Sequence, residues 1–374
     1  MSLTNFAALT DENYTVWGRD FWREARNKTF LMDFVGTSEN SMIQRVDELR
    51  QTNDGARAVI TLINEAQGDG VVGDNELDGN EEAMASDDFV IQLDQWRHAH
   101  SSKGRMAEQK SIIRFREEAR GTLSTRAANV IDQLLFLTLT GVDYSMNTDG
   151  TPRSGGSQLP QLSFNADVSA PTSRRHFRWD ATGGLLDSSD GTFAVSNLAA
   201  GDTPSWEMLV EMKAKAVNEF IKPIRSEGGI EMYNVFMTPD GIKALKKDTN
   251  FLEAWKHAQQ RGESNPIFKG TKHGGRKGIM IDGLNILEYR HVYHASNWGG
   301  GSQKGQAALL CGAQALAWAD INGHLPKWVE DLKDYKNRLG VSIGKIFGIR
   351  KPFLYSSHAQ SVQDFGVIRV DTSV

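Results

Sequence analysis

Residues 56–96 read ARAVITLINEAQ (56–67), GDGVVGDNELDGNEEAMASDD (68–88) and FVIQLDQW (89–96). The first piece contains the β-branched and apolar run from Val59 to Ile63, which predicts a strand. The last piece alternates in part between apolar and polar residues, which predicts a returning strand. The middle piece is rich in glycine and acidic residues. The whole stretch therefore predicts a long β-hairpin with a wide, acidic tip.

The charge of this stretch is one-sided. From Glu65 to Asp94 it carries carboxylates without a single Lys or Arg, and the next stretch, from Arg97 to Arg126, is predominantly basic. Blocks of like charge repel each other and often serve as interaction surfaces. Two interpretations fit this pattern: a solvated acidic loop, or an acidic hairpin that reaches a basic surface on a neighbouring copy. The charge pattern alone does not decide between them.

The candidate residues for contacts between copies are all charged and fall into an acidic group and two basic groups. They are Asp74, Glu76, Asp78, Glu81 and Glu82 in the hairpin, Arg114, Arg116 and Arg120 after it, and Arg174, Arg175 and Arg178 further along.

Residues 106–141 predict a helix, because apolar residues recur there at helical spacing. Its clearest stripe is Leu123, Ala127, Val130, Ile131, Leu134, Leu135 and Thr138. We expect Gly121 to bend or split the helix and Gly141 to end it.

Residues 142–203 show no sustained period and hold many Gly, Ser, Pro and Asn residues. Loops beyond about 12–15 residues are uncommon in a compact monomer. We therefore expect this segment to be disordered or held by neighbouring molecules.

The remainder of the chain predicts a mixture of helices and strands. Thr203-Pro204 predicts a helix start, with a capping residue followed by proline at the first helical position. A strand is expected at 233–237, followed by short helices to about residue 261. Further strands are expected within 279–293, within 307–319 and from residue 327 to the end.

Composition bounds the class of protein. The 374 residues carry 39% hydrophobic and 24% charged residues with a net charge of −5. This length suggests two domains, or one elaborate domain with long extensions, and the charge gives no global basic footprint for nucleic acid. The single cysteine, Cys311, lies in an apolar run and predicts a buried, inert thiol in a reducing compartment. The sequence predicts no membrane span and no signal peptide.

The acidic tip partly matches a calcium-binding loop. Asp74, Glu76 and Asp78, followed by Gly79, fit the first half of such a loop. The twelfth position, where a bidentate glutamate is needed, is Ala85. The sequence therefore favours a solvated or partner-bound tip over a calcium site.

Two histidine pairs remain as candidates for other chemistry. His98 and His100 alternate on a predicted strand, and His291 and His294 lie three apart, but neither pair has a third ligand at useful spacing. The phosphate-loop, dinucleotide-binding, nucleophile-elbow and zinc-protease motifs are missing from the sequence. We therefore expect no catalytic residues, no metal and no cofactor.

Several segments, taken in chain order, resemble one known family. Gly70–Gly73 and Leu77–Glu82 resemble the hairpin signature of the major capsid proteins of Enquatrovirus-like phages, which are tailed bacteriophages. Leu310–Ala317 is similar to a core strand of that family. The series is completed by Asn265–Gly270, Asp334–Asn337, Gly340–Gly348 and Asp364–Val370. The segment 142–203 carries no such match and resembles an insertion.

The resemblance implies an α+β fold of the Hong Kong 97-like (HK97-like) major capsid type. The implied parts are an N-terminal arm (1–55), an extended β-hairpin loop (56–104), a peripheral domain with a spine helix and the insertion at 142–203 (105–228), an axial domain (229–320), and C-terminal strands that complete the peripheral domain (321–374). Loops at 269–278 and 297–305 are candidates for the axial tip.

The resemblance also implies a structural role as a shell subunit without enzyme activity. Its implied partners are copies of itself in hexamers and pentamers, a portal, a scaffolding protein and a decoration protein. Packaged double-stranded DNA is implied to be enclosed but not specifically recognised. The implied locations are the virion and, before assembly, the host cytoplasm. Two alternatives stay open: an encapsulin-like nanocompartment shell, and a calcium-dependent enzyme or glycan-binding protein that uses Asp74, Glu76 and Asp78.

Overall fold

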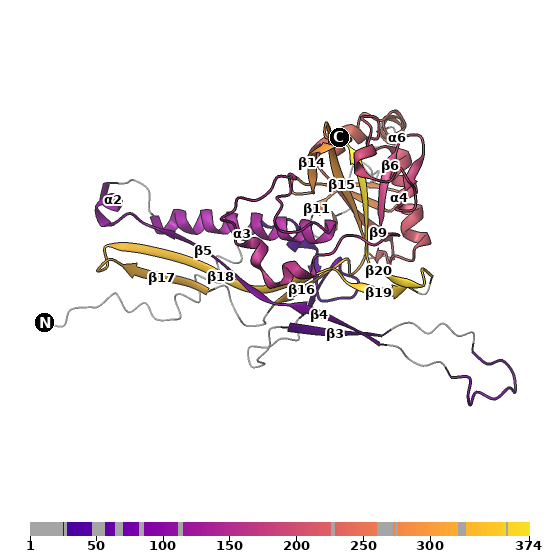
Figure 1. Ribbon diagram of the computed structural model, residues 1–374, viewed down its shortest axis with the longest axis horizontal. Helices are drawn as coiled ribbons and strands as arrows, with labels where there is room; N and C mark the ends of the chain where they lie inside the picture. Colours follow the sequence, from indigo (N-terminus) through magenta and orange to yellow (C-terminus); the bar gives the residue numbers. More distant parts are fainter. Residues whose placement is uncertain are drawn as a thin grey trace.

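The structure is a computed structural model of the full chain. It describes residues 25, 28–46, 57–63, 70–81, 86–110, 115–225, 229–259, 272–273, 276–320, 327–356 and 358–374. Figure 1 shows a long lower layer, an upper lobe at one end of it, and a hairpin that leaves the body.

The lower layer is a six-stranded sheet with a long helix along it (Figure 1). The sheet runs in the order β1 (Val35–Gly36), β2 (Ile43–Val46), β16 (Leu316–Asp320), β18 (Arg338–Arg350) and β17 (Lys327–Lys333), and β5 (Asp94–Ser101) pairs with β18 as well. The helix is α3 (Phe115–Thr140). Its first half packs Leu123 and Ala127 against Trp328, Val341 and Ile343 of the sheet.

The upper lobe is built on a nine-stranded sheet. Its strands are β12 (Ile279–Ile281), β13 (Leu284–Glu288), β9 (Glu231–Met237), β15 (Gln303–Cys311), β21 (Val367–Ser373), β6 (His176–Asp180) and β7 (Gly184–Leu186), with β14 (His294–Trp298) beside β15 and β8 (Ile224–Arg225) beside β9.

Both faces of this sheet are covered, which explains the nearly continuous apolar runs in its strands. Val235 and Leu310 face the helices α4 (Trp206–Asn218), α5 (Pro239–Leu245) and α6 (Thr249–Gln259). Phe236 and Leu309 face the opposite way, into a cluster with the second half of α3. The helix α3 thus packs against both sheets and joins them into one body.

The N-terminal segment 28–46 is part of this body. Phe30, Leu31 and Phe34 are buried in the cluster with α3. Asp132 of α3, itself fully buried, accepts hydrogen bonds from the backbone N–H groups of Phe30 (2.9 Å) and Leu31 (3.1 Å).

The hairpin of β3 (Arg57–Ile63) and β4 (Ser86–Gln92) is seated on the body at its base (Figure 1). Phe89 and Ile91 of β4 are buried against Ala317 and Ala319 of β16. β4 approaches β18 so closely that a Cβ at Gly348 would collide with the backbone oxygen of Gln92. The remaining short elements are α2 (Arg105–Lys110), the pair β10 (Lys272–His273) and β11 (Arg276–Lys277), and the pair β19 (Phe353–Ser356) and β20 (Ser361–Asp364).

The predicted elements are largely confirmed, with shifts at their ends. The returning strand is divided at Leu93 into β4 and β5, and the described residues of the helical region after it form α2 and α3, on either side of residues 111–114, which lie outside the described part. Gly121 does not bend or split α3, so that expectation was wrong, whereas Gly141 adopts a φ of +76° directly after the helix ends. The helix predicted from Thr203-Pro204 begins later, with the Ser205 side chain as its cap.

The expectation that residues 142–203 lack regular structure was also wrong. Within this segment β6 pairs with β21 and β7 pairs with β6, so it extends the nine-stranded sheet. Tyr144 and Phe164 are fully buried in the main core. Widely spaced aromatic residues anchor the segment, and such anchors produce no period in the sequence.

Candidate functional site

The acidic tip, residues 70–81, is exposed throughout apart from a half-buried Val71. Two amide side chains stabilise its turns: Asn75 Nδ2 donates to Val72 O at 2.7 Å, and Asn80 Nδ2 donates to Glu76 O at 3.0 Å. Val72 and Leu77 are 78% and 61% exposed. A charged surface that also presents two large apolar side chains is suited to a contact with another molecule.

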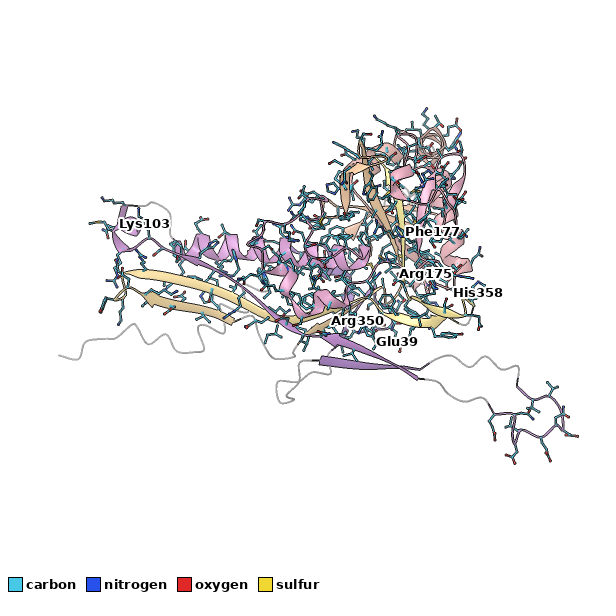
Figure 2. All side chains as sticks on the ribbon, in the orientation of Figure 1. Glu39, Lys103, Arg175, Phe177, Arg350 and His358 are labelled. Atoms are coloured by element: carbon cyan, nitrogen blue, oxygen red, sulfur yellow. The ribbon has the colours of Figure 1, made fainter. Side chains whose placement is uncertain are left out.

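The described carboxylates of the tip are exposed. They are Asp74, Glu76, Asp78 and Glu81, and Glu82 lies outside the described residues. Figure 2 shows the side chains of the tip far from the rest of the molecule. Among the described residues, no three or more His, Cys, Asp or Glu side chains form a group that could hold a metal ion.

Arg175 is used inside the subunit. It is buried, and its guanidinium donates to Asp364 O (2.9 Å), to Glu219 O (3.0 Å) and to Glu219 Oε2 (3.1 Å). Figure 2 places Arg175 within the body. Arg174 is partly exposed and reaches the same Glu219 at 3.4 Å.

Arg178 is also directed inward. Its side chain is 2% exposed and lies 3.3 Å from Asp202 and 3.2 Å from Asp180. It also donates to Asn197 O at 2.9 Å. Arg175 therefore fixes the segment 142–203 to the body, and Arg178 ties parts of that segment to one another. Both leave almost no surface for a neighbouring copy. Arg174 is the exposed member of this group.

The basic residues of the spine helix have a mixed placement. Arg116 forms an ion pair with Glu330 of β17 at 2.6 Å and keeps 43% of its side chain exposed. Arg120 is half-buried on the next turn, and Arg114 lies outside the described residues. The structure therefore does not bring the predicted basic groups together into one patch.

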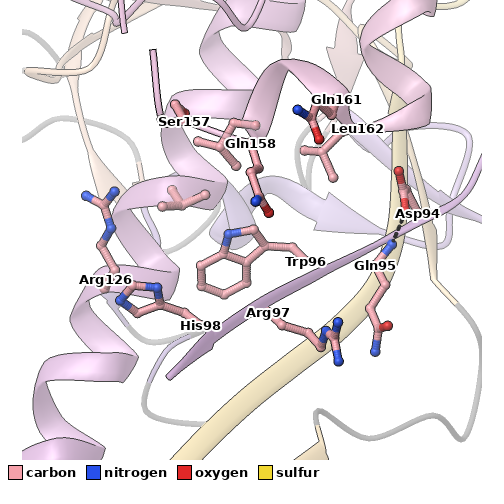
Figure 3. Close-up of a pocket in the computed structure, with 13 residues that line it drawn as sticks. Asp94, Gln95, Trp96, Arg97, His98, Arg126, Ser157, Gln158, Gln161 and Leu162 are labelled. Atoms are coloured by element: carbon pink, nitrogen blue, oxygen red, sulfur yellow. Dashed lines mark hydrogen bonds between the residues drawn. The ribbon is translucent and has the colours of Figure 1, made fainter. Parts of the chain in front are cut away.

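A cavity of about 550 Å³ lies between β5, the spine helix and the loop around residue 158 (Figure 3). Trp96 and His98 stack at its base, with ring centroids 6.2 Å apart, and Arg126 stands beside them. Burial, followed by the charges of His100 and Arg126, lowers the pKa of His98. His98 is therefore neutral at pH 7 and contributes packing rather than charge.

The one carboxylate that lines this cavity is used to hold the loop. Asp94 Oδ2 accepts from the backbone N–H of Ser163 at 2.7 Å and from its hydroxyl at 3.0 Å. The other oxygen accepts from the N–H of Gln95 at 2.7 Å. Asp94 thus has a structural role as a clamp between β5 and the loop.

The remaining candidate groups are inert or internal. Cys311 is buried, and burial raises the pKa of its thiol far above the ordinary value. Burial, with Arg290 and His294 nearby, lowers the pKa of His291 to about 4. No helix in the described part of the chain has the length and apolar character needed to cross a bilayer.

Sequence reasoning missed the buried polar contacts that hold the layers together. Lys351 and Asp364, both 1% exposed, form an ion pair at 3.3 Å. Burial lowers the pKa of Lys351 and raises that of Asp364, and their mutual attraction opposes both shifts. Asp132 likewise joins the N-terminal segment to Tyr289, because its carboxylate accepts a hydrogen bond from the Tyr289 hydroxyl at 2.5 Å. The only signal for Asp132 in the sequence was its position as a charged residue within an apolar helical stripe.

Comparison with known proteins shows the family of the chain. A family described as phage capsid protein matches residues 5–374. The chain belongs to the phage capsid protein family. A curated relative, the major capsid protein of Pseudomonas phage KPP25, is 47% identical over 98% of this chain and 96% of its own length.

Solved capsid structures share the fold of this capsid protein. The capsid of Ralstonia phage GP4 matches with a TM-score of 0.74 and 27% identity, over 93% of this chain and 92% of its own. The capsid of Cyanophage Pam1 matches with a TM-score of 0.68 and 19% identity, over 92% and 91%. The predicted α+β, HK97-like fold is confirmed.

Proposed function

We propose that this capsid protein is the major capsid protein of a tailed phage, and that it assembles into the hexamers and pentamers of an icosahedral shell around double-stranded DNA. The observation that carries the proposal is the near full-length similarity to a protein of that name. The hairpin supports it, because its tip extends from a complete body and exposes Val72 and Leu77. A structural, non-enzymatic role agrees with Asp94, Arg175 and Arg178 being used within the fold.

Electron microscopy of the expressed protein, alone and with its scaffolding protein, tests this function. We expect closed particles of uniform size. A subunit that stays monomeric in every condition would contradict the proposal. Similarity to phage capsid proteins favours the phage function over a nanocompartment.

We infer that the subunit is organised into the parts that the sequence predicted: arm, extended loop, peripheral domain, axial domain and C-terminal strands. The hairpin 57–92 supports the extended loop, and α3 supports the spine helix. Strand pairing, however, puts β21 and β6 in the sheet of the axial domain. That sheet therefore includes parts of the segments 142–203 and 321–374.

The proposed partners are other copies of this chain, a portal, a scaffolding protein and a decoration protein. Packaged DNA is enclosed without specific recognition, and the subunit resides in the host cytoplasm before assembly. We further propose the Enquatrovirus-like group as its closer relatives, on the collinear motifs alone. A solved capsid structure from that group should superpose over those motifs, and a poorer fit than that of the Ralstonia phage GP4 capsid would contradict the placement.

We also propose that the acidic tip docks on a basic surface of a neighbouring copy. Replacing Glu81 and Glu82 together by lysine is expected to impair assembly more than it impairs folding of the subunit. Particle yield by sedimentation and the melting temperature of the unassembled subunit measure the two effects. Normal particles from this variant would refute the docking.

A further inference from the structure

A lysine and an aspartate meet in the interior at the base of the β19–β20 pair. Lys351 directly follows β18, and Asp364 is the last residue of β20, opposite Phe353 of β19. Both side chains are 1% exposed. Figure 1 shows β19 and β20 at the end of the lower layer, under the upper lobe. The amine and the carboxyl group therefore face each other away from the surface.

The Lys351 amine is equally close to both oxygens of the Asp364 carboxyl group. Its Nζ lies 3.3 Å from Oδ1 and 3.3 Å from Oδ2. A hydrogen bond between a lysine and a carboxylate is usually shorter, at about 2.7–2.9 Å. An amine at the same distance from both oxygens is aligned with the carboxyl carbon that joins them. Groups held in this way, with reacting atoms about 3–3.5 Å apart, are placed for attack.

The two oxygens of Asp364 have different surroundings. Oδ2 accepts a hydrogen bond from the backbone N–H of Thr172 at 3.2 Å. Oδ1 is buried and has no hydrogen-bond partner within the described part of the chain. A fixed N–H donor stabilises the negative charge that develops on an oxygen when a carboxyl carbon is attacked. Oδ2 is therefore placed to become the oxygen of an amide, and Oδ1 is placed to leave.

Burial favours the uncharged forms of both groups. It is the largest influence on each, lowering the pKa of Lys351 and raising the pKa of Asp364, against their mutual attraction. Moving one proton across the contact converts the ion pair into a neutral amine beside a carboxylic acid. The ion pair gains little over this neutral form, because removing two charges from water costs several kcal/mol for each. A desolvated, neutral lysine amine is a nucleophile.

We propose that Lys351 and Asp364 of the same subunit join in an isopeptide bond. The lone pair of Lys351 Nζ attacks Asp364 Cγ, so that a C–N bond forms and the bond from Cγ to Oδ1 breaks. Nζ loses one proton, and Oδ1 leaves as water with that proton and the proton of the acid. The reaction consumes no oxidant and no other reactant. It takes place inside one folded subunit and is independent of assembly.

The isopeptide bond closes a covalent ring from residue 351 to residue 364 that contains both β19 and β20. The chain has a single cysteine, so a disulfide cannot cross-link it internally. A cross-link stabilises a fold mainly by restricting the unfolded chain. The base of the ring is already fixed in the fold, because Phe365 N donates to Pro352 O at 3.0 Å. The bond therefore locks a strand pair whose two ends the fold has brought together.

Mass spectrometry of the purified full-length protein tests this bond. Trypsin cuts after Arg350 and Arg369, and Lys351 precedes a proline, so both partners lie on the peptide 351–369. We expect this peptide to be lighter by the mass of one water molecule. Backbone fragments from within 351–364 should be missing, because the ring holds the two pieces together. A peptide of unmodified mass from the folded protein would overturn the proposal.

Lys351→Arg is the matched variant, because it keeps a positive charge beside Asp364 while its guanidinium stays protonated and cannot attack. Its peptide should have the unmodified mass. A loss of water that persists in this variant, or that yields fragments from within 351–364, would identify a succinimide at Asp364 and overturn the proposal.

A surface pair of the same protein is the internal control. Lys213 and Asp282 lie closer together, at 2.8 Å, but their side chains are 29% and 65% exposed. Solvent keeps both groups charged, so their peptides should have the unmodified mass. A water-losing cross-link there as well would show that proximity alone is sufficient and would overturn the role given to burial.

Discussion

Two segments that looked alike in sequence behave in opposite ways in the structure. The segment 142–203 and the hairpin tip 70–81 are both rich in glycine and polar residues. The first is anchored by Tyr144 and Phe164, which are fully buried, and its arginines bind carboxylates of the same chain. The tip exposes the large side chains that it has. The difference teaches that the burial of a few large residues, not periodicity, decides whether such a segment belongs to the body.

The sharpest test of that difference is the removal of one anchor. Phe164 is fully buried, with its ring 5.8 Å from that of Tyr144 and 5.4 Å from that of Phe347. Phe164→Ala should lower the free energy of unfolding of the unassembled subunit by about 3–5 kcal/mol. Urea denaturation measures it. A loss below about 1 kcal/mol would mean that the segment is not anchored there.

The joint between the body and the hairpin should be the next most sensitive. Gly348→Ala places a methyl group in collision with the backbone oxygen of Gln92, where β4 crosses β18. The same methyl group would lie 2.9 Å from Ile91 Cγ2. Overpacking of this kind should cost about 1–3 kcal/mol. Amide hydrogen exchange should increase in β4 and remain unchanged in β9. Unchanged exchange in β4 would show that its seat on the body tolerates the methyl group.

A smaller, pH-dependent effect is expected within 142–203. Asp180 accepts hydrogen bonds from Thr182 Oγ1, Thr182 N and Gly183 N, and these hold its pKa at about 2. The pKa in the folded state lies below the unfolded value of about 3.9, so the contribution is fully present above pH 4 and is lost as the pH falls towards 2.

Asp180→Asn should therefore cost about 1–2 kcal/mol at pH 7, and the difference from wild type should shrink as the pH falls below 4. Urea titrations at pH 7 and pH 3 give this comparison. A pH-independent difference would contradict this prediction, because the hydrogen bonds and the ion pair with Arg178 both depend on the negative charge of Asp180.

The smallest effect on folding is expected at the tip. Val72→Ser with Leu77→Ser removes exposed apolar side chains, so the free energy of unfolding should change by less than about 0.5 kcal/mol. Particle yield should nevertheless fall. A large loss of subunit stability would show that the tip packs on its own body, which would remove the contrast between the two segments.

Much of the fold was predictable where local pattern decides it. The stripe from Leu123 to Thr138 predicted the helix that the structure shows as α3. The run from Val59 to Ile63 predicted the strand β3. The errors arose where distant contacts decide. β6 pairs with β21, which is distant in sequence, and β7 pairs in turn with β6. Gly121 is a different kind of error, since it stays helical as part of the long helix α3.

The candidate contact residues show the same division. Exposure of the acidic tip followed from its composition, with its long run free of cations. The internal role of Arg175 could not be predicted in the same way, because Glu219 and Asp364, which bind it, are distant in sequence. Asp334, Tyr335 and Lys336 adopt the left-handed backbone in succession, with φ of 55°, 50° and 68°, and the sequence analysis did not predict this turn.

The position of the last strand has a consequence for how the protein is made. β21 lies in the interior of the nine-stranded sheet, with β15 on one side and β6 on the other. At about 5–20 residues per second, Phe177 is added to the growing chain about 10–40 s before its neighbour Val370. Until translation ends, β6 has no central strand to join. A prematurely terminated chain therefore keeps an open sheet, and only finished polypeptides can acquire the rigid shape that a regular lattice requires.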